Sequence, residues 1–276
     1  MQPIISIIIP CYNGEKYLRE TLDCLQKQTI DAWECIVVND GSTDGSLEII
    51  KEYSEKDSRY KYFDQPNQGP AAARNFAVNH ASGVYVLPLD ADDIIAPSYL
   101  EKAVSYLEIH TDTKLVYCKA HYFGEKNGPF VLPEYSYDRL IWENPIFCSC
   151  VFRKSDFDIV GGYDIQMKGA LEDWEFLIRL LKESDKVYCI PEGLFYYRQH
   201  TGTRNEDVKK RQIACRYIVR KHFERYEDYC LNIHQYKTDS ENYQKWFYEI
   251  YNSKSFQLGQ VLLAPLKCLF KFLGQK

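Results

Sequence analysis

The sequence of 276 residues contains no internal repeat and no low-complexity linker, which excludes repeat architectures and long flexible spacers. Its ten cysteines are scattered and form no CxxC pair, and the closest two, Cys148 and Cys150, lack the spacing of a usual zinc site. An apolar run at positions 4–9 is too short for a secretory signal and stops at Pro10. We therefore expect reduced thiols in a cytosolic protein.

The chain also lacks a basic stripe through its body and a GxGxxG motif after its first apolar run. These absences argue against a nucleic-acid partner and against a dinucleotide dehydrogenase. The net charge of −5 is unevenly spread, because residues 206–276 hold 13 basic and 8 acidic side chains, whereas residues 1–205 hold 21 and 31. An acidic body with a basic tail fits a tail that meets an anionic surface.

Short apolar runs alternate with segments of helical spacing along the first part of the chain. The strands expected there are 4–9, 33–38, 60–63 and 84–89, and the helices are 15–28, 46–54 and 70–80. This alternation predicts a parallel sheet with helices on both faces. Further helices are expected at 98–110, at 170–182 and from 206 onward, with strands at 115–123, 130–132 and 186–190.

The acidic stretch Asp90-Ala91-Asp92-Asp93 directly follows the strand expected at 84–89. Side chains two apart in an extended segment point the same way, so Asp90 and Asp92 can face one point. Such carboxylates repel each other unless a cation lies between them, and their hard oxygen atoms suit Mg²⁺ or Mn²⁺. The alternative is a solvated acidic turn in which Asp93 caps the next helix.

Ligands of parallel α/β sheets bind at the carboxyl ends of the strands, and the candidate polar residues fall there. Tyr12 and Asn13 follow the first expected strand, Asp40 ends the second, and Asp90 and Asp92 follow the fourth. We therefore expect these side chains to surround one ligand.

A series of short motifs runs through residues 4–205. In chain order they are Pro10-Cys11-Tyr12-Asn13, Val38-Asn39-Asp40-Gly41-Ser42-Thr43-Asp44, Asn67-Gln68-Gly69, Arg74-Asn75, Leu89-Asp90-Ala91-Asp92-Asp93, Gly161-Gly162-Tyr163, Glu172-Asp173-Trp174-Glu175 and Tyr197-Arg198-Gln199-His200. With all of them in this order, the chain resembles the family 2 glycosyltransferases of the GT-A fold.

This resemblance implies an α/β protein with a Rossmann-like, mostly parallel nucleotide-binding sheet flanked by helices and a helical C-terminal extension. The catalytic domain would occupy residues 1–205, with a nucleotide-sugar half at 1–97 and an acceptor and catalytic half at 98–205. Residues 206–276 would form the extension. Members are inverting enzymes that use a nucleotide-diphosphate sugar, here typically a UDP-sugar, and a divalent metal.

The activity implied is transfer of a hexosyl or N-acetylhexosaminyl group to an acceptor hydroxyl. Members commonly build bacterial polysaccharides and lipid-linked glycans, so a glycan or lipid-linked acceptor is expected. A sugar-phosphate nucleotidyltransferase is one alternative, but those enzymes usually have a glycine-rich loop with arginine after the first strand, unlike residues 10–14 here. A non-catalytic domain that binds a glycan or a partner is another.

The resemblance assigns the nucleotide to residues after the first two strands. Asp40 would accept a hydrogen bond from the base, and Pro10, Tyr12 and Asn13 would form the wall around the base and the ribose. The alternatives are that Asp40 only forms a turn and that Tyr12 fills the core.

The diphosphate and the metal would contact the next motifs. Gln68 and Gly69 open a helix whose amides can meet a diphosphate, and Arg74 can supply a positive charge. For Arg74 a structural ion pair is the alternative. By resemblance, Asp92 binds the metal directly, while Asp90 holds the ribose or supports the metal through water.

Asp173 lies on the apolar face of the helix that it helps to begin, together with Phe176 and Leu177. An inward carboxylate is costly unless it is used or paired. The resemblance makes Asp173 the general base that deprotonates the acceptor, with Glu172 as a support. The alternative is stabilisation of the helix dipole by acids in the first turn.

The late motif places Arg198 and His200 after the last expected strand. By resemblance, His200 is a metal ligand or a donor to the diphosphate, and Arg198 pairs with the diphosphate or with Glu172. A nitrogen ligand favours Mn²⁺ over Mg²⁺.

Residues 256–273 are rich in Leu and Phe, carry Lys267 and Lys271, and are interrupted by Pro265. They are too short and too charged for a membrane span. An interfacial helix at the inner face of the plasma membrane and docking on the body or on a second subunit of a homo-oligomer are both open.

Overall fold

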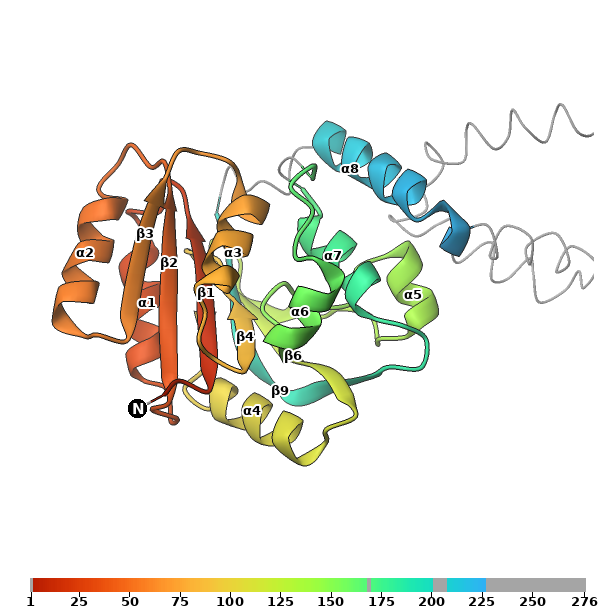
Figure 1. The fold of residues 1–276 in the computed structure, drawn as a ribbon, viewed down its shortest axis with the longest axis horizontal. Helices are drawn as coiled ribbons and strands as arrows, with labels where there is room; N and C mark the ends of the chain where they lie inside the picture. The colour runs from red at the N-terminus through yellow and green to blue at the C-terminus, as the bar shows by residue number, and fades with distance from the viewer. Residues whose placement is uncertain (1, 168–169, 201–207, 227–276) are drawn as a thin grey trace, which may run out of the picture. The chain divides into compact units, whose positions relative to one another are not determined.

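The computed structural model describes residues 2–167, 170–200 and 208–226. The chain divides into two compact units, one of residues 1–140 and 144–203 and one of residues 141–143 and 204–276. The first unit contains the sheet and every motif named above (Figure 1). The second contains α8 (Val208–Lys221), inside the region expected to be helical. The domain boundary after residue 205 stays a prediction.

One sheet organises the first unit, in the strand order β3-β2-β1-β4-β8-β6-β9-β5, with β7 paired to β6. Four parallel strands form its first part: β1 (Ile5–Cys11), β2 (Trp33–Asp40), β3 (Tyr60–Gln65) and β4 (Tyr85–Pro88). Every residue of β2 and β4 is buried, as expected for inner strands that are covered on both faces. The parallel sheet predicted from the sequence is confirmed.

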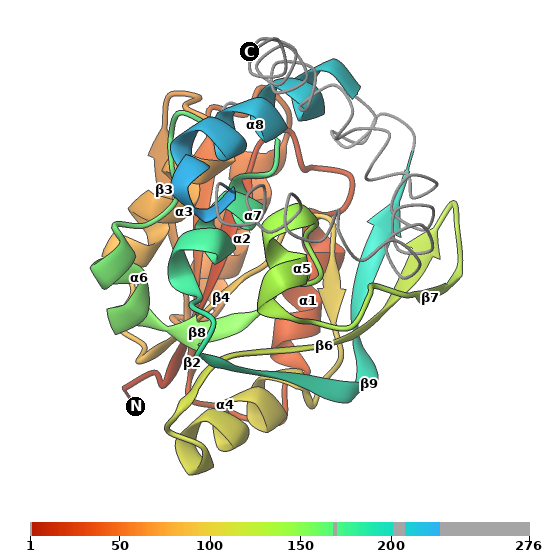
Figure 2. The same ribbon diagram turned by 90° about the vertical axis from the view of Figure 1, so that its right-hand side faces the viewer.

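The second part of the sheet is mixed. Its strands are β5 (Ile94–Ile95), β6 (Thr113–Gly124), β7 (Gly128–Phe130), β8 (Val151–Arg153) and β9 (Lys186–Gln199). β8 lies antiparallel between β4 and β6, and β6 is parallel to β9. β6 also pairs with β7 as a hairpin, and Figure 2 shows β9 next to these two strands. Because two antiparallel steps restore the strand direction, β9 ends at the same edge of the sheet as β1, β2 and β4.

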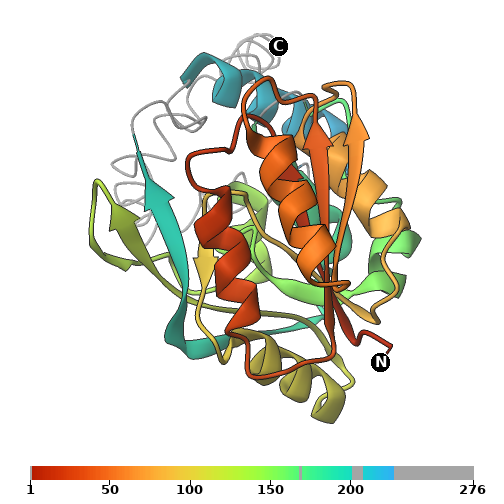
Figure 3. The same ribbon diagram turned by 90° about the vertical axis from the view of Figure 1, so that its left-hand side faces the viewer.

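The helices of the first unit cover both faces of the parallel strands. Figure 3 shows α1 and α2 in front of β1 to β3, and Figure 1 shows α3 on the other side. The described helices are α1 (Leu18–Gln26), α2 (Ser46–Lys56), α3 (Pro70–Asn79), α4 (Tyr99–Ile109), α5 (Tyr137–Trp142), α6 (Lys154–Val160) and α7 (Glu172–Leu180). α1 buries Leu18, Leu22 and Leu25, whose spacing of three or four residues forms one apolar face.

Within the described residues, the elements expected from the sequence are present, with small shifts of their ends, but several short ones were missed. Residues 227–276, where further helix was expected, lie outside the described residues. β5, β8, α5 and α6 hold two to seven residues each, too few to show a period. β9 extends past the expected end at residue 190 because it pairs with β6 over its whole length. Capping by Asp93 was wrong: α4 begins at Tyr99, after its N-cap Ser98.

Within the described ranges, no helix combines the length and apolar character that a membrane crossing requires. Residues 256–273, for which a membrane contact or a docking role was expected, lie outside the described residues.

Candidate functional site

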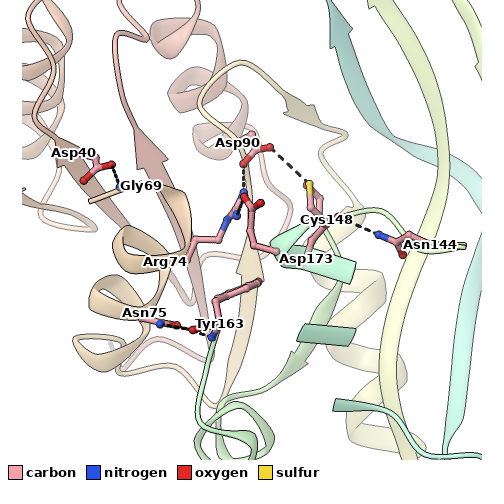
Figure 4. Close-up of polar contacts among 11 residues, drawn as sticks. Asp40, Gly69, Arg74, Asn75, Asp90, Asn144, Cys148, Tyr163 and Asp173 are labelled. Carbon is pink, nitrogen blue, oxygen red and sulfur yellow. Dashed lines mark hydrogen bonds and ion pairs between the residues drawn. The ribbon is translucent and has the colours of Figure 1, made fainter. Parts of the chain in front are cut away.

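The carboxyl ends of β1, β2, β4 and β9 meet at one edge of the sheet, and the predicted site residues gather there (Figure 4). Residues far apart in the sequence come together here: Asp92 and His200 are 108 positions apart, yet their side chains are in contact. α3 and α7 contribute Arg74 and Asp173 to the same edge.

Asp40, at the end of β2, is buried and accepts three hydrogen bonds. Its Oδ1 receives the Gln65 side-chain amide and the Gln68 backbone amide, each at 2.8 Å, and its Oδ2 receives the Gly69 amide at 2.8 Å. Gly69 has a φ of +89°, a backbone conformation that favours glycine. The backbone amides of Gln68 and Gly69 therefore donate to Asp40. The sequence had led us to expect that these amides would be free to bind a diphosphate.

The loop after β1 carries Tyr12 and Asn13. Tyr12 is 53% exposed, so the alternative that it fills the core was wrong. The side-chain oxygen of Asn13 accepts the Thr43 amide at 2.8 Å, and the Asn13 amide donates to the Ser42 hydroxyl at 3.0 Å. These bonds join the loop after β1, the strand that contains Pro10, to the loop after β2. The Tyr12 ring stays exposed at this edge of the sheet.

Arg74, on α3, is buried and forms two ion pairs. Its Nη2 lies 2.6 Å from Asp90 Oδ1, and its Nη1 lies 2.9 Å from Glu172 Oε1. The structure thus contains the structural ion pair that was the alternative for this residue. Arg74 links the end of β4 to the start of α7, and so brings Asp90 close to Asp173 (Figure 4).

Asp92 and His200 form the pair expected to hold a metal. His200 Nε2 lies 3.0 Å from Asp92 Oδ2, and burial together with the Asp90 charge raises the pKa of Asp92. An octahedral ion with ligand distances of about 2.1 Å places neighbouring ligand atoms about 3.0 Å apart. The separation of this pair, together with the neighbouring carboxyl groups of Asp90 and Asp93, therefore suits a divalent cation.

A second group of candidate ligands lies beside this pair. Among the described residues, only Asp90, Asp93 and Cys148 bring three ligand atoms of acidic, histidine or cysteine side chains within 4.8 Å of one another. Burial, and then the charge of Asp92, raise the pKa of Asp93 well above its usual value, and burial raises that of the Cys148 thiol in the same way. These shifts favour the protonated form of both groups, which binds a metal less well than the ionised form.

Arg198 supports the loop that carries the acidic residues. Its amide donates to Asp93 Oδ1 at 2.8 Å, its Nε donates to the Asp92 carbonyl at 2.7 Å, and its Nη2 lies 2.5 Å from Glu20 Oε2. The guanidinium also lies over the rings of Tyr17 and Phe123. The expected pairing with Glu172 was wrong, because Glu172 pairs with Arg74.

Asp173, the expected base, is the second residue of α7 and is half-buried. Burial and the neighbouring Glu172 charge raise its pKa to about 6. Its Oδ2 accepts a hydrogen bond from Asn144 Nδ2 at 3.0 Å, while Asn144 Oδ1 accepts the Ile146 amide at 3.2 Å. The second contact fixes which way the Asn144 amide points, and so fixes the orientation of the Asp173 carboxylate.

The Gly161-Gly162-Tyr163 motif holds α3 in place. Asn75 exchanges two hydrogen bonds with the Tyr163 backbone, at 2.8 and 2.7 Å. Gly162 has a φ of +72°, and a Cβ built there would lie 2.6 Å from Asn75 Oδ1. The glycine therefore permits the close approach that anchors the residue next to Arg74.

Sequence reasoning missed Asn144, Cys148 and Glu20. Asn144 and Cys148 lie in a stretch without a recognisable motif, and Glu20 lies in α1, where it reads as an ordinary surface acid. Only the tertiary contacts with Asp173, Asp90 and Arg198 bring these residues into the site.

Comparison with protein families gives one match over most of the sheet. The model described as Glycosyl transferase family 2 matches residues 6–161. GlyA of Streptococcus pneumoniae, named as a glycosyltransferase, is 34% identical over 203 residues, which are 70% of this chain and 29% of GlyA. MJ1057 of Methanocaldococcus jannaschii, named as an uncharacterized glycosyltransferase, is 29% identical over 254 residues, covering 86% of this chain and 85% of MJ1057.

Among solved structures, TarS of S. aureus in complex with UDP aligns with a TM-score of 0.65 and 25% identity. The alignment covers 79% of this chain and 64% of the TarS chain. The chain thus spans less than two thirds of TarS and under a third of GlyA.

Proposed function

The chain belongs to glycosyl transferase family 2, and from that premise we propose that it is an inverting, metal-dependent transferase. It moves a hexosyl or N-acetylhexosaminyl group from a nucleotide-diphosphate sugar to an acceptor hydroxyl. The observation that carries the proposal is the Arg74 bridge, which joins Asp90, beside the Asp92–His200 pair, to the helix of Asp173. A cation site and a base thereby lie within one cluster.

The donor is a UDP-sugar in this proposal. Support comes from the TarS structure, which holds UDP and shares 25% identity with this chain. The base and the ribose lie against Pro10, Tyr12 and Asn13, with Tyr12 available for stacking because half of its surface is exposed. Asp40 pairs with the base through a carboxylate that the amides of Gln68 and Gly69 hold in place.

Asp92 and His200 would hold Mn²⁺ or Mg²⁺ and so supply positive charge to the diphosphate as it leaves. Asp90 binds the ribose or supports the ion through water, and Arg74 fixes its carboxylate. Arg198 holds the Asp92 carbonyl and the Asp93 carboxyl, which keeps the loop in place. The role of Arg198 toward the diphosphate is therefore indirect.

Asp173 takes the proton of the acceptor hydroxyl. The acceptor oxygen then forms its bond to the anomeric carbon on the face opposite the diphosphate, and the bond from that carbon to the diphosphate oxygen breaks. The configuration at carbon inverts because the nucleophile enters opposite the leaving group. Asn144 keeps one carboxylate oxygen of Asp173 occupied, so the other oxygen receives the proton.

The acceptor is a glycan or a lipid-linked glycan, and the product belongs to a cell-surface polysaccharide. This part extends the membership of the chain in glycosyl transferase family 2. The reaction takes place in the cytoplasm or at the inner face of the membrane, where nucleotide sugars are supplied.

The variant Asp173→Asn tests the proposal. It keeps the shape of the side chain but cannot accept a proton, and a positioned base is worth about 10²–10⁴ in rate. We expect a loss of that size in kcat for transfer from UDP-sugars with Mn²⁺, with donor binding unchanged by calorimetry. Glu48→Gln, an exposed change on α2, is the matched control. Normal turnover of Asp173→Asn would remove the base assignment.

A further inference from the structure

The charged side chains of α8 are all of one sign. Its fourteen residues, Val208–Lys221, include six basic side chains and no acidic one. The buried side of the helix consists of Ala214, Cys215 and Ile218. The remaining surface of α8, the last coloured helix in Figure 1, is therefore strongly cationic.

The exposed side of this helix also carries large apolar side chains. Lys209, Ile213, Arg216 and Arg220 on α8, and Phe223 just beyond its last residue, follow one another at intervals of four or three residues, and all five are exposed. That spacing places the first four on one helical face, which together with Phe223 is here named the α8 stripe. Ile213 is 67% exposed and lies between basic residues, and Phe223 is 46% exposed and follows Arg220.

We propose that the α8 stripe docks on an anionic membrane surface. The basic side chains contact lipid phosphates, and Ile213 and Phe223 enter the boundary between headgroups and acyl chains. Charge complementarity carries the choice, since residues 208–226 hold seven basic side chains and one acidic side chain. The stripe lies in the described residues and does not depend on the segment 256–273.

Other anionic partners fit this surface less well. A nucleic-acid backbone would pair with the lysine and arginine side chains but would leave Ile213 and Phe223 exposed to water. A protein interface concentrates its apolar groups at a centre with few charges, whereas bases separate the apolar groups of the α8 stripe. A lipid interface accepts both kinds of side chain along one helix.

Co-sedimentation of the full chain with vesicles tests the proposal. We expect binding to vesicles of phosphatidylcholine mixed with phosphatidylglycerol, and little binding to phosphatidylcholine alone. Binding at about 0.1 M salt should be largely lost at about 1 M, where the Debye length falls from roughly 10 to 3 Å.

The variant K209Q/R216Q/R220Q should bind anionic vesicles about 100-fold more weakly, at roughly fivefold for each base. Ile213→Ser should also weaken binding, because it removes an inserting side chain. The matched control K27Q/K51Q/K119Q removes the same charge from exposed positions of the first unit and should bind as the wild type does. Circular dichroism melting confirms that all variants are folded.

Three results would overturn the proposal. They are equal binding by the wild type and K209Q/R216Q/R220Q, equal binding to neutral and anionic vesicles, and binding to RNA or to an acidic protein without binding to vesicles. The assay contains no nucleotide sugar, so its outcome is independent of the proposed transfer reaction.

Discussion

The proposed base, Asp173, should make the activity sensitive to pH. Its pKa is raised to about 6 by burial and by Glu172, and a general base acts only when it is ionised. We expect kcat/KM to rise with pH through a midpoint near 6 and then to level off. The measurement is a pH–rate profile with saturating metal.

Asn144→Asp should move this profile. A second carboxylate next to Asp173 disfavours its ionised form, so the midpoint should rise by about one pH unit. Asn127→Asp, on the exposed loop between β6 and β7, is the control and should leave the midpoint unchanged. An unmoved midpoint in Asn144→Asp would show that Asp173 is not the titrating base.

Individual residues were predictable where a motif marked them. The proximity of Asp92 and His200 was implied by the family resemblance, although 108 positions separate them. The partner of Arg74 did not follow, because a cation one turn into a helix can face a ligand or a carboxylate equally well. Asn144 carries no local signal, since its role depends on where the loop after α5 meets α7.

At the scale of elements, Arg74 joins α3, the end of β4 and the start of α7. Arg74→Met leaves Asp90 and Glu172 without this partner in a buried setting. Removing one partner of such a pair costs about 3–5 kcal/mol, and we expect that loss in the free energy of unfolding by urea. Arg19→Met, which breaks an exposed pair with Glu52, should change the free energy of unfolding much less. Equal costs for both variants would contradict the role of the bridge.

The contact between α3 and the loop after α6 depends on Gly162. Gly161→Ala and Gly162→Ala both place a side chain at a positive φ, of 77° and 72°, which costs about 1 kcal/mol. Only at Gly162 does the added Cβ meet other atoms, Asn75 Oδ1 at 2.6 Å and Phe157 Cζ at 2.8 Å. We expect Gly162→Ala to lose roughly 2–3 kcal/mol of stability and Gly161→Ala about half of that or less. Thermal unfolding of the two variants measures the difference.

Long elements were predictable because apolar spacing defines them. β1, β2 and β4 are mostly apolar, and α1 has a regular apolar face. β5 and β8 hold only two and three residues, so they become strands through pairing with β9, β4 and β6. The pairing of β6 with β9 depends on the whole sheet, so the sequence of neither strand alone indicates its partner.

At the scale of the whole molecule, ligand binding at the edge should stabilise the entire first unit. A ligand at 100 times its Kd adds about 2.7 kcal/mol to the folded state. We expect UDP with Mn²⁺ to raise the Tm of the wild type by several degrees, and UDP with EDTA to raise it much less. Asp92→Asn should lose most of the Mn²⁺-dependent shift, whereas Glu48→Gln should keep it. A shift independent of Mn²⁺ in the wild type would contradict the proposed cation site.

The order of the strands determines when this edge is completed. Among the described residues, β9 is the last strand of the sheet along the chain, and Arg198 and His200 lie at its end. A chain on the ribosome folds from its N-terminus, so it already carries Asp40, Asp90 and Asp92 while these two residues are still missing. A nascent chain that has not yet made β9 therefore cannot place His200 against Asp92, so this contact is among the last at the edge to form.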